Sequence, residues 1–214
     1  YQQARQVIDT PGGAYYAKLL EAKGITYLGS FHNGFRQLTN SKHPVTKPED
    51  LKDLKIRVPG SAVYMGVFNA LGASPTAMSW SEVFTAIQQK TIDGQENGCS
   101  VTKSAKMDEI QQYMTIWNYS YENDLFVANS RVWESLDENT RQLLQECATE
   151  SCEWGRDHLE AEEDQLIQGF MDSGMQVDIL TEDQLQAFKD AVAGVTADLK
   201  AEYGEDACAA FGIN

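Results

Sequence analysis

The amino-acid sequence predicts an α/β fold, in which helices flank a sheet. Two observations indicate this fold class: short apolar runs alternate with amphipathic segments through the first half of the chain, and the helix starts are well marked. With 214 residues, 42% of them hydrophobic, the chain is long enough for one large domain or two small ones sharing a cleft. No stretch approaches the roughly 18 consecutive apolar residues of a membrane-spanning helix.

Strands are expected where apolar residues cluster between turn-forming residues. The expected strands cover residues 25–30, 36–39, 55–58 and 124–129, with a short extended segment over residues 91–95. Pro59 closes the strand with the sequence KIRV, because proline cannot donate a ladder hydrogen bond.

Helix starts and stops are marked by capping residues. Pro48 with the acids that follow it is typical of a first helical turn, and Ser79 with Glu82 has the spacing of a capping box. Another helix is expected over residues 62–71, before Gly72. The opening residues read as helix, turn and helix with no start signal, so we expect the chain to open within a domain.

The second half of the chain is predicted to be mostly helical. Residues 137–173 form one long helix that ends at Gly174, with apolar residues near one broad face and enough length to brace two lobes. A last helix begins at Thr181, where Gln184 completes a capping box, and runs to about residue 203.

The composition excludes several classes of function. The formal charge is −15 and the 17 Lys and Arg residues are spread along the chain, which argues against a nucleic acid partner. No CxxC spacing occurs and the three histidines are scattered, so no zinc site or other metal site and no dithiol motif are expected. A disulfide between Cys208 and either Cys147 or Cys152 stays open, at about even odds, if the C-terminal tail folds back.

Catalytic motifs are absent as well. The sequence has no GxSxG, no phosphate-cradling glycine loop and no HExxH, so we expect neither an enzyme nor a bound cofactor. The acidic cluster around Glu160, Glu162 and Glu163 is read as solvated charge on a polar helix face rather than as an acid/base pair.

Two arginines differ from the others because each lies inside an apolar segment with strand character. These are Arg36 in NGFRQLTNS and Arg57 in LKIRVPG. Taken singly, each is more often an internal ion pair with a nearby acid. The functional alternative is bidentate capture of a ligand carboxylate by the planar, permanently charged guanidinium.

Three stretches resemble one protein family closely. NGFRQLTNSKHPVTKPEDLKDLKIRVPGS, LGASPTAMSWSEVFTAIQQKTIDGQENG and the long helix are similar, in colinear order over nearly all of the chain, to the dicarboxylate-binding (DctP) type solute receptors of tripartite ATP-independent periplasmic (TRAP) transporters. The most specific parts are L-K-x-R-V-P, G-A-x-P-T-x-M-x-[aromatic]-S-E-V and D-G-Q-E-N.

The resemblance implies a two-lobed α/β receptor of the periplasmic-binding-protein type (type II), with mixed sheets, a long helix spanning both lobes and the N-terminal part of the first lobe missing. It implies residues 1–30 as the remainder of the N-terminal lobe and residues 31–125 as the second lobe, with most ligand contacts. Residues 126–214 would supply a crossover strand, the spanning helix and the C-terminal helix. The receptor would be periplasmic, a monomer or dimer, would not span the membrane, and would deliver its ligand to TRAP membrane subunits.

The ligand contacts implied by the resemblance are carried over position by position. Arg57 would form the bidentate salt bridge to the carboxylate, and Arg36 would be the second cationic contact. Trp80 would pack on the carbon body of the ligand, and Asn97 would donate a hydrogen bond. The other implied contacts are Ser61 and Tyr121. Without the family, Trp80 reads as core filler and Asn97 as a turn residue.

Two departures from the family pattern affect ligand identity. Cys99 follows Gly98 where the family commonly continues with Glu-Asn-Pro, and Gly60 stands where a polar side chain often helps to bind ligand. A second arginine suits a dicarboxylate, whereas Trp80 suits a sugar acid, and both stay open. Competing classes are a sensing or interaction module with the same fold, a remnant completed by dimerisation and, last, a hydrolase or lyase.

Overall fold

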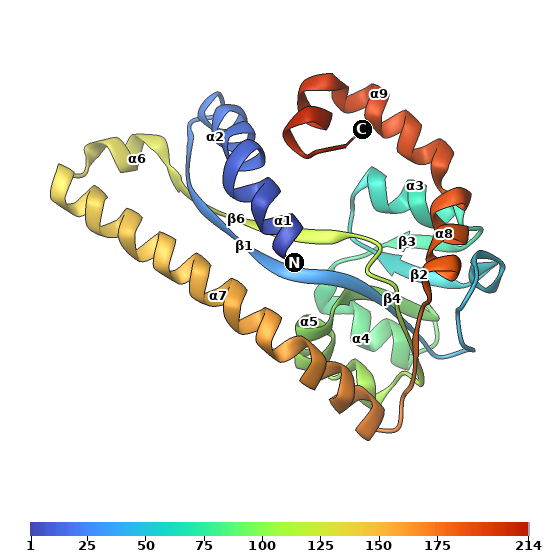
Figure 1. Ribbon diagram of the computed structural model, residues 1–214. Coiled ribbons are helices and arrows are strands. Elements are labelled where there is room, and N and C mark those ends of the chain that lie inside the picture. The colour runs from blue at the N-terminus through green and yellow to red at the C-terminus, as the bar shows by residue number, and fades with distance from the viewer. Residues whose placement is uncertain (214) are drawn as a thin grey trace. The chain divides into compact units, whose positions relative to one another are not determined.

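A computed structural model describes residues 1–213 and divides them into two compact units, which are treated separately (Figure 1). Unit 1 comprises Tyr1–Gly34, Tyr121–Glu162 and the described residues from Tyr203 onward, and unit 2 comprises Phe35–Ser120 and Glu163–Glu202. The lobe boundaries expected at residues 30/31 and 125/126 stay a prediction.

A mixed sheet forms the centre of unit 2, in the strand order β3-β2-β4-β1-β5-β7. Strand β2 runs parallel to β3 and β4, strand β1 runs antiparallel to β4 and β5, and β5 runs parallel to β7. The strands are β1 (Ile25–Asn40), β2 (Lys55–Val58), β3 (Ser74–Ala77), β4 (Gly94–Gly98), β5 (Tyr113–Ile116) and β7 (Gln176–Ile179).

Helices pack against the sheet and bury apolar side chains of its strands. In unit 2 these are α3 (Ala62–Ala70), α4 (Trp80–Gln88), α5 (Cys99–Ser104) and α8 (Glu182–Ala191), with 3-10 turns at Pro48–Leu51 and Met107–Glu109. One core cluster joins Ile56 and Val58 of β2 to Phe68 of α3 and Phe188 of α8. A second cluster, around Val83 of α4, packs separately. The first cluster therefore packs β2 against α3 and α8.

Unit 1 is built on a two-stranded ribbon in which β6 (Tyr121–Asn129) pairs with β1. Its helical segments are α1 (Gln2–Val7), a π-type turn at Ile8–Gly12, α2 (Gly13–Glu21) and α6 (Ser130–Ser135), together with parts of α7 (Glu138–Asp172) and α9 (Ala193–Ala210). The Oγ atoms of Thr26 and Ser130 lie 2.9 Å apart, which ties the start of β1 to the start of α6.

Several expectations for the elements are confirmed and others are wrong. Strand β2, the long helix α7 and the capping box of Thr181 with Gln184 are as expected. The two strands expected over residues 25–30 and 36–39 are one continuous strand, which includes Gly34 at a φ of +88°. The last helix is two helices, α8 and α9, and Ser79 makes no capping hydrogen bond to α4.

The buried face of α7 in unit 1 is not the one that the apolar pattern predicted. Ala148, Cys152 and Arg156, spaced four residues apart, are buried, whereas Leu143 and Trp154 are 60% and 67% exposed. All four cysteines are free thiols, so the disulfide that the sequence left open does not form between these described residues.

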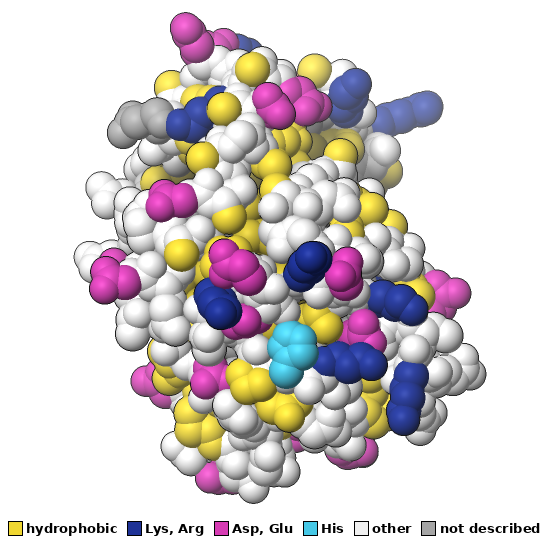
Figure 2. All heavy atoms as spheres, turned by 90° about the vertical axis from the view of Figure 1, so that its right-hand side faces the viewer, with side chains coloured by type: hydrophobic (Ala, Val, Ile, Leu, Met, Phe, Trp, Pro, Cys, Tyr) yellow, Lys and Arg dark blue, Asp and Glu magenta, His cyan; other side chains and the backbone are white. Residues whose placement is uncertain are grey.

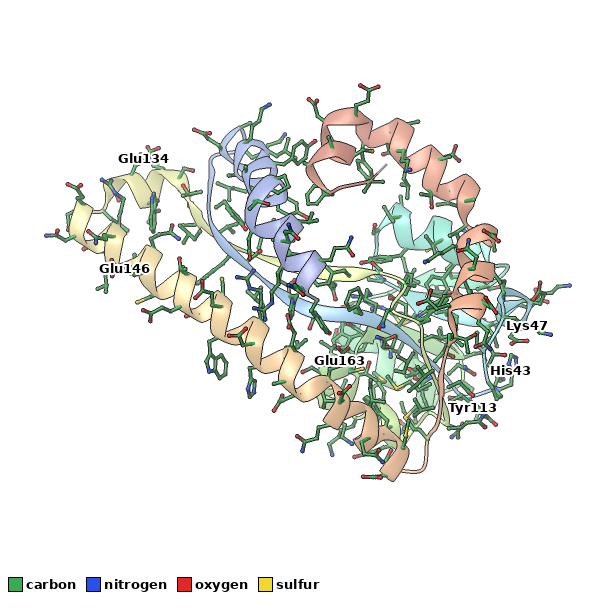
Figure 3. The ribbon with its side chains drawn as sticks, viewed as in Figure 1. His43, Lys47, Tyr113, Glu134, Glu146 and Glu163 are labelled. Atoms are coloured by element: carbon green, nitrogen blue, oxygen red, sulfur yellow. The ribbon has the colours of Figure 1, made fainter. Side chains whose placement is uncertain are left out.

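The charged side chains and the histidines are spread over several elements. On the face shown in Figure 2, acidic and basic side chains are interspersed rather than gathered by sign. His32 lies in β1, His43 in the loop after β1 (Figure 3) and His158 on α7. The described residues contain no group of three metal-ligating side chains, and no helix among them is both long and apolar enough to cross a membrane.

Candidate functional site

Three parallel strands of unit 2 end at one edge of the sheet, and each leads directly into a helix. Strand β2 is followed by the N-cap of α3 at Ser61, β3 by the N-cap of α4 at Ser79, and β4 ends at Gly98, the N-cap of α5. Helix N-termini carry unpaired N–H groups and partial positive charge. This edge, called here the anion edge, therefore favours a negatively charged group.

The register of the sheet brings both sequence-predicted arginines to the anion edge. Arg57, one residue before the end of β2, pairs with Gln95 of β4. Arg36, on the neighbouring antiparallel strand β1, pairs with Gly98 at the end of β4. Two strand arginines that lie 21 residues apart in sequence are thus separated by a single strand.

The guanidinium of Arg57 is held by its surroundings in unit 2. Its Nε and Nη2 donate hydrogen bonds to the backbone oxygen of Met78, at 3.0 and 2.8 Å, and its Cζ lies 5.2 Å from the centroid of the Trp80 ring. Arg57 is only 6% exposed. The Met78 carbonyl is neutral, so these two hydrogen bonds orient the guanidinium without neutralising its charge.

Arg36 makes an internal ion pair, which is the structural alternative considered for it from the sequence. Its Nε and Nη2 contact Oε2 and Oε1 of Glu96 at 2.5 and 2.9 Å, and Nη2 also donates to the Glu96 backbone oxygen. The hydroxyl of Tyr119 donates to the same carboxylate at 2.5 Å, and the Tyr64 ring centroid lies 5.1 Å from Arg36 Cζ. The role of Arg36 as a second ligand contact stays a prediction.

Burial governs the proton affinities in this cluster. Desolvation raises the pKa of Glu96, and the hydrogen bonds from Arg36 oppose that rise. Burial, reinforced by the neighbouring Glu96, raises the pKa of Tyr119 well above its usual value, so the phenol keeps its proton as a hydrogen-bond donor. The carboxylate of Glu96 therefore offsets the charge of Arg36 within this buried cluster.

Two further predicted contacts lie at the anion edge. Asn97, 7% exposed in β4, accepts a hydrogen bond from the Gly98 amide through Oδ1. Ser61 caps α3, and its hydroxyl accepts from the Val63 amide at 3.3 Å. Five of the six predicted residues (Arg36, Arg57, Ser61, Trp80 and Asn97) thus belong to unit 2.

The sixth predicted residue, Tyr121, belongs to unit 1. Its hydroxyl lies 2.8 Å from Nδ1 of His32, whose Nε2 is 3.6 Å from Glu160. Burial raises the pKa of Tyr121 and lowers that of His32. Arg5 binds Glu160 and Asp157 beside this pair. Tyr121 is therefore part of a polar cluster of unit 1, and its contact with ligand stays a prediction.

Glu96, Tyr119 and Tyr64 were not identified from the sequence. The sequence carried one signal for Glu96, because it is an acid in the G-Q-E-N-G segment beside the expected extended residues. The structure shows that every position of this strand is buried. A fully buried charged residue requires a partner of opposite charge. Tyr119 and Tyr64 had no comparable signal, since aromatic residues are ordinary core components.

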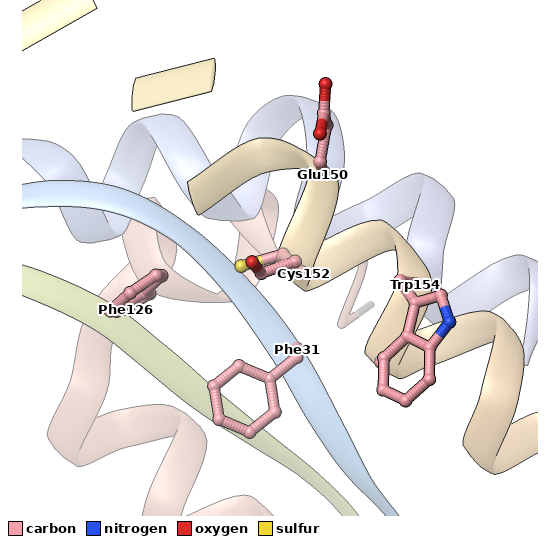
Figure 4. A pocket seen from close by; sticks show the side chains of 7 residues that line it. Phe31, Phe126, Glu150, Cys152 and Trp154 are labelled. Atoms are coloured by element: carbon pink, nitrogen blue, oxygen red, sulfur yellow. The ribbon is translucent and has the colours of Figure 1, made fainter. Parts of the chain in front are cut away.

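A hollow of about 820 Å³ lies in unit 1, and its lining does not suit an anion (Figure 4). Phe31 of β1, Phe126 of β6, and Cys152 and Trp154 of α7 line it. Its only charged lining residue is Glu150, an acid, so a carboxylate there would meet apolar surface and like charge.

Comparisons with known proteins identify the family of the chain. Residues 1–202 match the family model described as bacterial extracellular solute-binding protein, family 7. The chain is 33% identical over 196 residues to the 2,3-diketo-L-gulonate-binding periplasmic protein YiaO of Escherichia coli, a match that covers 92% of this chain and 59% of that protein. The chain thus spans about three fifths of the length of this relative.

Solved structures share the fold. A TRAP periplasmic solute-binding protein of Ralstonia eutropha with bound (S)-2-acetolactate matches with a TM-score of 0.95 and 32% identity, over 100% of this chain and 70% of that one. A similar protein of Shewanella oneidensis with bound succinate matches with a TM-score of 0.92 and 32% identity, over 99% and 70%. These matches confirm the predicted fold class, and by the family match the chain belongs to the bacterial extracellular solute-binding proteins of family 7.

Proposed function

We propose that this chain acts as an extracytoplasmic receptor for a small organic carboxylate and delivers it to the membrane subunits of a TRAP transporter. The observation that carries the proposal is the oriented guanidinium of Arg57 at an edge where three helices begin. A carboxylate docked there gains charge-assisted hydrogen bonds from a permanently charged group. The helix N-termini add favourable partial charge.

The ligand class follows from the charges at the anion edge. Glu96 pairs with Arg36, and the neutral Met78 carbonyl orients the guanidinium of Arg57, so a ligand carboxylate is the complement proposed for Arg57. The Trp80 ring beside Arg57 offers an apolar face to the carbon body of the ligand. The relatives bind small organic acids: their names and structures specify a diketo sugar acid, acetolactate and succinate.

The role in transport rests on the family match. A periplasmic location and work with membrane subunits are what the related solute-binding proteins support. A receptor of this kind binds its ligand without changing it, so we propose no catalytic step.

A thermal-shift experiment with matched ligands tests the proposal. Gluconate is compared with glucitol, and succinate with 1,4-butanediol, because each pair differs mainly in the charged carboxylate groups. At 100 times its dissociation constant, a bound acid adds about 2.7 kcal/mol of stability. We expect at least one acid to raise the melting temperature and neither polyol to do so. Equal shifts for an acid and its alcohol, or no shift with a wider panel of small acids, would contradict the proposal.

A further inference from the structure

The last helix of the chain is broken where it passes from one unit to the other. Helix α9 contains Gly204 at a φ of +81° and a ψ of +173°, a backbone conformation that glycine adopts and residues with a Cβ avoid. Residues up to Glu202 belong to unit 2, and the described residues from Tyr203 onward belong to unit 1. Gly204 therefore separates two helical pieces that have different surroundings.

The piece before Gly204 is fixed in unit 2. Val192, the C-cap of α8, packs against the main core cluster of that unit. Cγ1 of Val195, in the first turn of α9, lies against α3, 3.4 Å from the position that a Cβ on Gly66 would occupy. The start of α9 is thus held both by the core and by a neighbouring helix.

The piece after Gly204, called here the strap (residues 203–213), is held in unit 1 by one large side chain. The ring of Phe211 packs on α2, with its centroid 5.9 Å from that of Tyr15 and 5.0 Å from that of Tyr16. Its Cε1 lies 2.9 Å from the position that a Cβ on Gly12 would occupy, so the absence of a side chain at Gly12 makes room for the ring. Gly12, Tyr15 and Tyr16 together form the seat of Phe211.

The rest of the strap is weakly attached. Within the part of the chain that the structure describes, the strap makes no hydrogen bond or ion pair to α1, α2 or the ribbon of unit 1. Its hydrogen bonds stay inside the strap, as does the one from the Phe211 amide to the Ala207 oxygen at 3.1 Å. Tyr203 is 55% exposed and Ile213 is 47% exposed. Segments with so few buried contacts open locally at low free-energy cost.

We propose that residues 203–213 form a reversible strap, which docks on α2 through Phe211 and swings away about Gly204 while the rest of unit 1 stays folded. The chain passes between the two units at four points, after residues 34, 120, 162 and 202. The first and third of these points lie inside the continuous elements β1 and α7. The fourth is fixed only while Phe211 is docked, so the strap is a detachable restraint between the units.

Cys208, a half-buried free thiol within the strap, reports its release. Cys99 and Cys152 are buried, and Cys147→Ser removes the exposed thiol, so rapid labelling by 5,5′-dithiobis(2-nitrobenzoic acid) then occurs at Cys208. Loss of the anchoring ring in Phe211→Ala should raise the labelling rate about ten-fold or more.

Three variants in the same background separate the anchor from the pivot. Gly12→Ala places a Cβ against the ring of Phe211 and should also raise the labelling rate of Cys208. Gly204→Val should do the same with the anchor intact, because a β-branched residue cannot keep the backbone conformation of Gly204. Tyr203→Ala removes an exposed ring from the same segment and is the control, with a change in rate of less than about two-fold.

Hydrogen exchange followed by mass spectrometry locates the opening. In Phe211→Ala, exchange should become faster across the strap and stay as in the parent across α2 and β1. Exchange that rises in all three segments would mean that unit 1 unfolds as a whole, and would overturn the proposal.

Two outcomes of the labelling experiment would overturn the proposal as well. If Cys208 reacts no faster in Phe211→Ala and Gly12→Ala than in Tyr203→Ala, Phe211 is not the anchor. If Gly204→Val reacts at the rate of the parent, Gly204 is not the pivot. Gluconate and succinate are left out of these measurements, so their outcome is independent of the proposed receptor function.

Discussion

Replacing Glu96 by Gln should destabilise the protein strongly, because it leaves the charge of Arg36 buried without a carboxylate. Glu96 is 0% exposed and Arg36 is 1% exposed, and their side chains make two contacts at 2.5 and 2.9 Å. Removing one partner of a buried ion pair costs about 3–5 kcal/mol. For a chain of this length, that loss lowers the melting temperature by roughly 6–20 °C.

Urea unfolding followed by circular dichroism measures this loss, with Glu109→Gln as the matched control. Glu109 pairs with Lys106, and both side chains are exposed, so the control should lose no more than about 1 kcal/mol. The double variant Arg36→Met/Glu96→Leu should recover most of the loss, since apolar residues of similar volume often replace a buried pair without cost. If Glu96→Gln is no less stable than Glu109→Gln, the reasoning about the buried charge is wrong.

Three further predictions concern other parts of the chain. Trp80→Ala removes the ring 5.2 Å from the site guanidinium and should weaken gluconate binding roughly 2–30-fold, as measured by calorimetry; unchanged affinity would speak against that contact. Gly94→Ala places a Cβ against the backbone oxygen of Thr39 and should cost at least about 2 kcal/mol in urea unfolding. Gly155→Ala, with open space around it in α7, should gain up to about 1 kcal/mol. Burial lowers the pKa of His32 below 6.5, so the unfolded chain binds the proton more readily and stability falls as the pH drops through 6.5, by at most about 1.4 kcal/mol per pH unit. Melting temperatures at pH 7.5 and 5.5 should differ less in His32→Gln than in the parent, and an identical difference would show that another group is responsible.

The strands that the sequence missed are short or interrupted. Strand β3 contains Pro75, which normally argues against a strand, but β3 lies at the edge of the sheet, where a missing N–H donor is tolerated. Strands β5 and β7 have four residues each and no long apolar run. In contrast, β2 was predictable because Ile56, Arg57 and Val58 are consecutive buried positions before a proline.

The continuity of β1 depends on contacts that lie far away in sequence. Its middle section contains His32 and Asn33, which are unusual strand residues. There Nδ1 of His32 lies 2.8 Å from the hydroxyl of Tyr121, and Asn33 donates to the carboxylate of Glu122; both partners come from β6. No local pattern carries that information, because the partners are 89 residues away.

The candidate site could be predicted in part: the local sequence identified the arginines but not their partners. The positions of Arg36 and Arg57 within apolar segments identified both as special, and their placement at one edge follows from strand register. Whether each arginine meets an acid of its own chain depends on which residues face it across the sheet. Glu96 faces Arg36 across 60 residues of sequence, and only the fold brings them together.

The most direct test of the receptor proposal is isothermal titration calorimetry of the parent protein, Arg57→Ala and Arg131→Ala with gluconate and succinate. Arg131 is an exposed arginine of α6 and serves as the control for loss of one positive charge. We predict that at least one acid binds the parent and Arg131→Ala equally, and that Arg57→Ala binds it about 30- to 4,000-fold more weakly, which corresponds to about 2–5 kcal/mol. Undiminished affinity in Arg57→Ala would contradict the account.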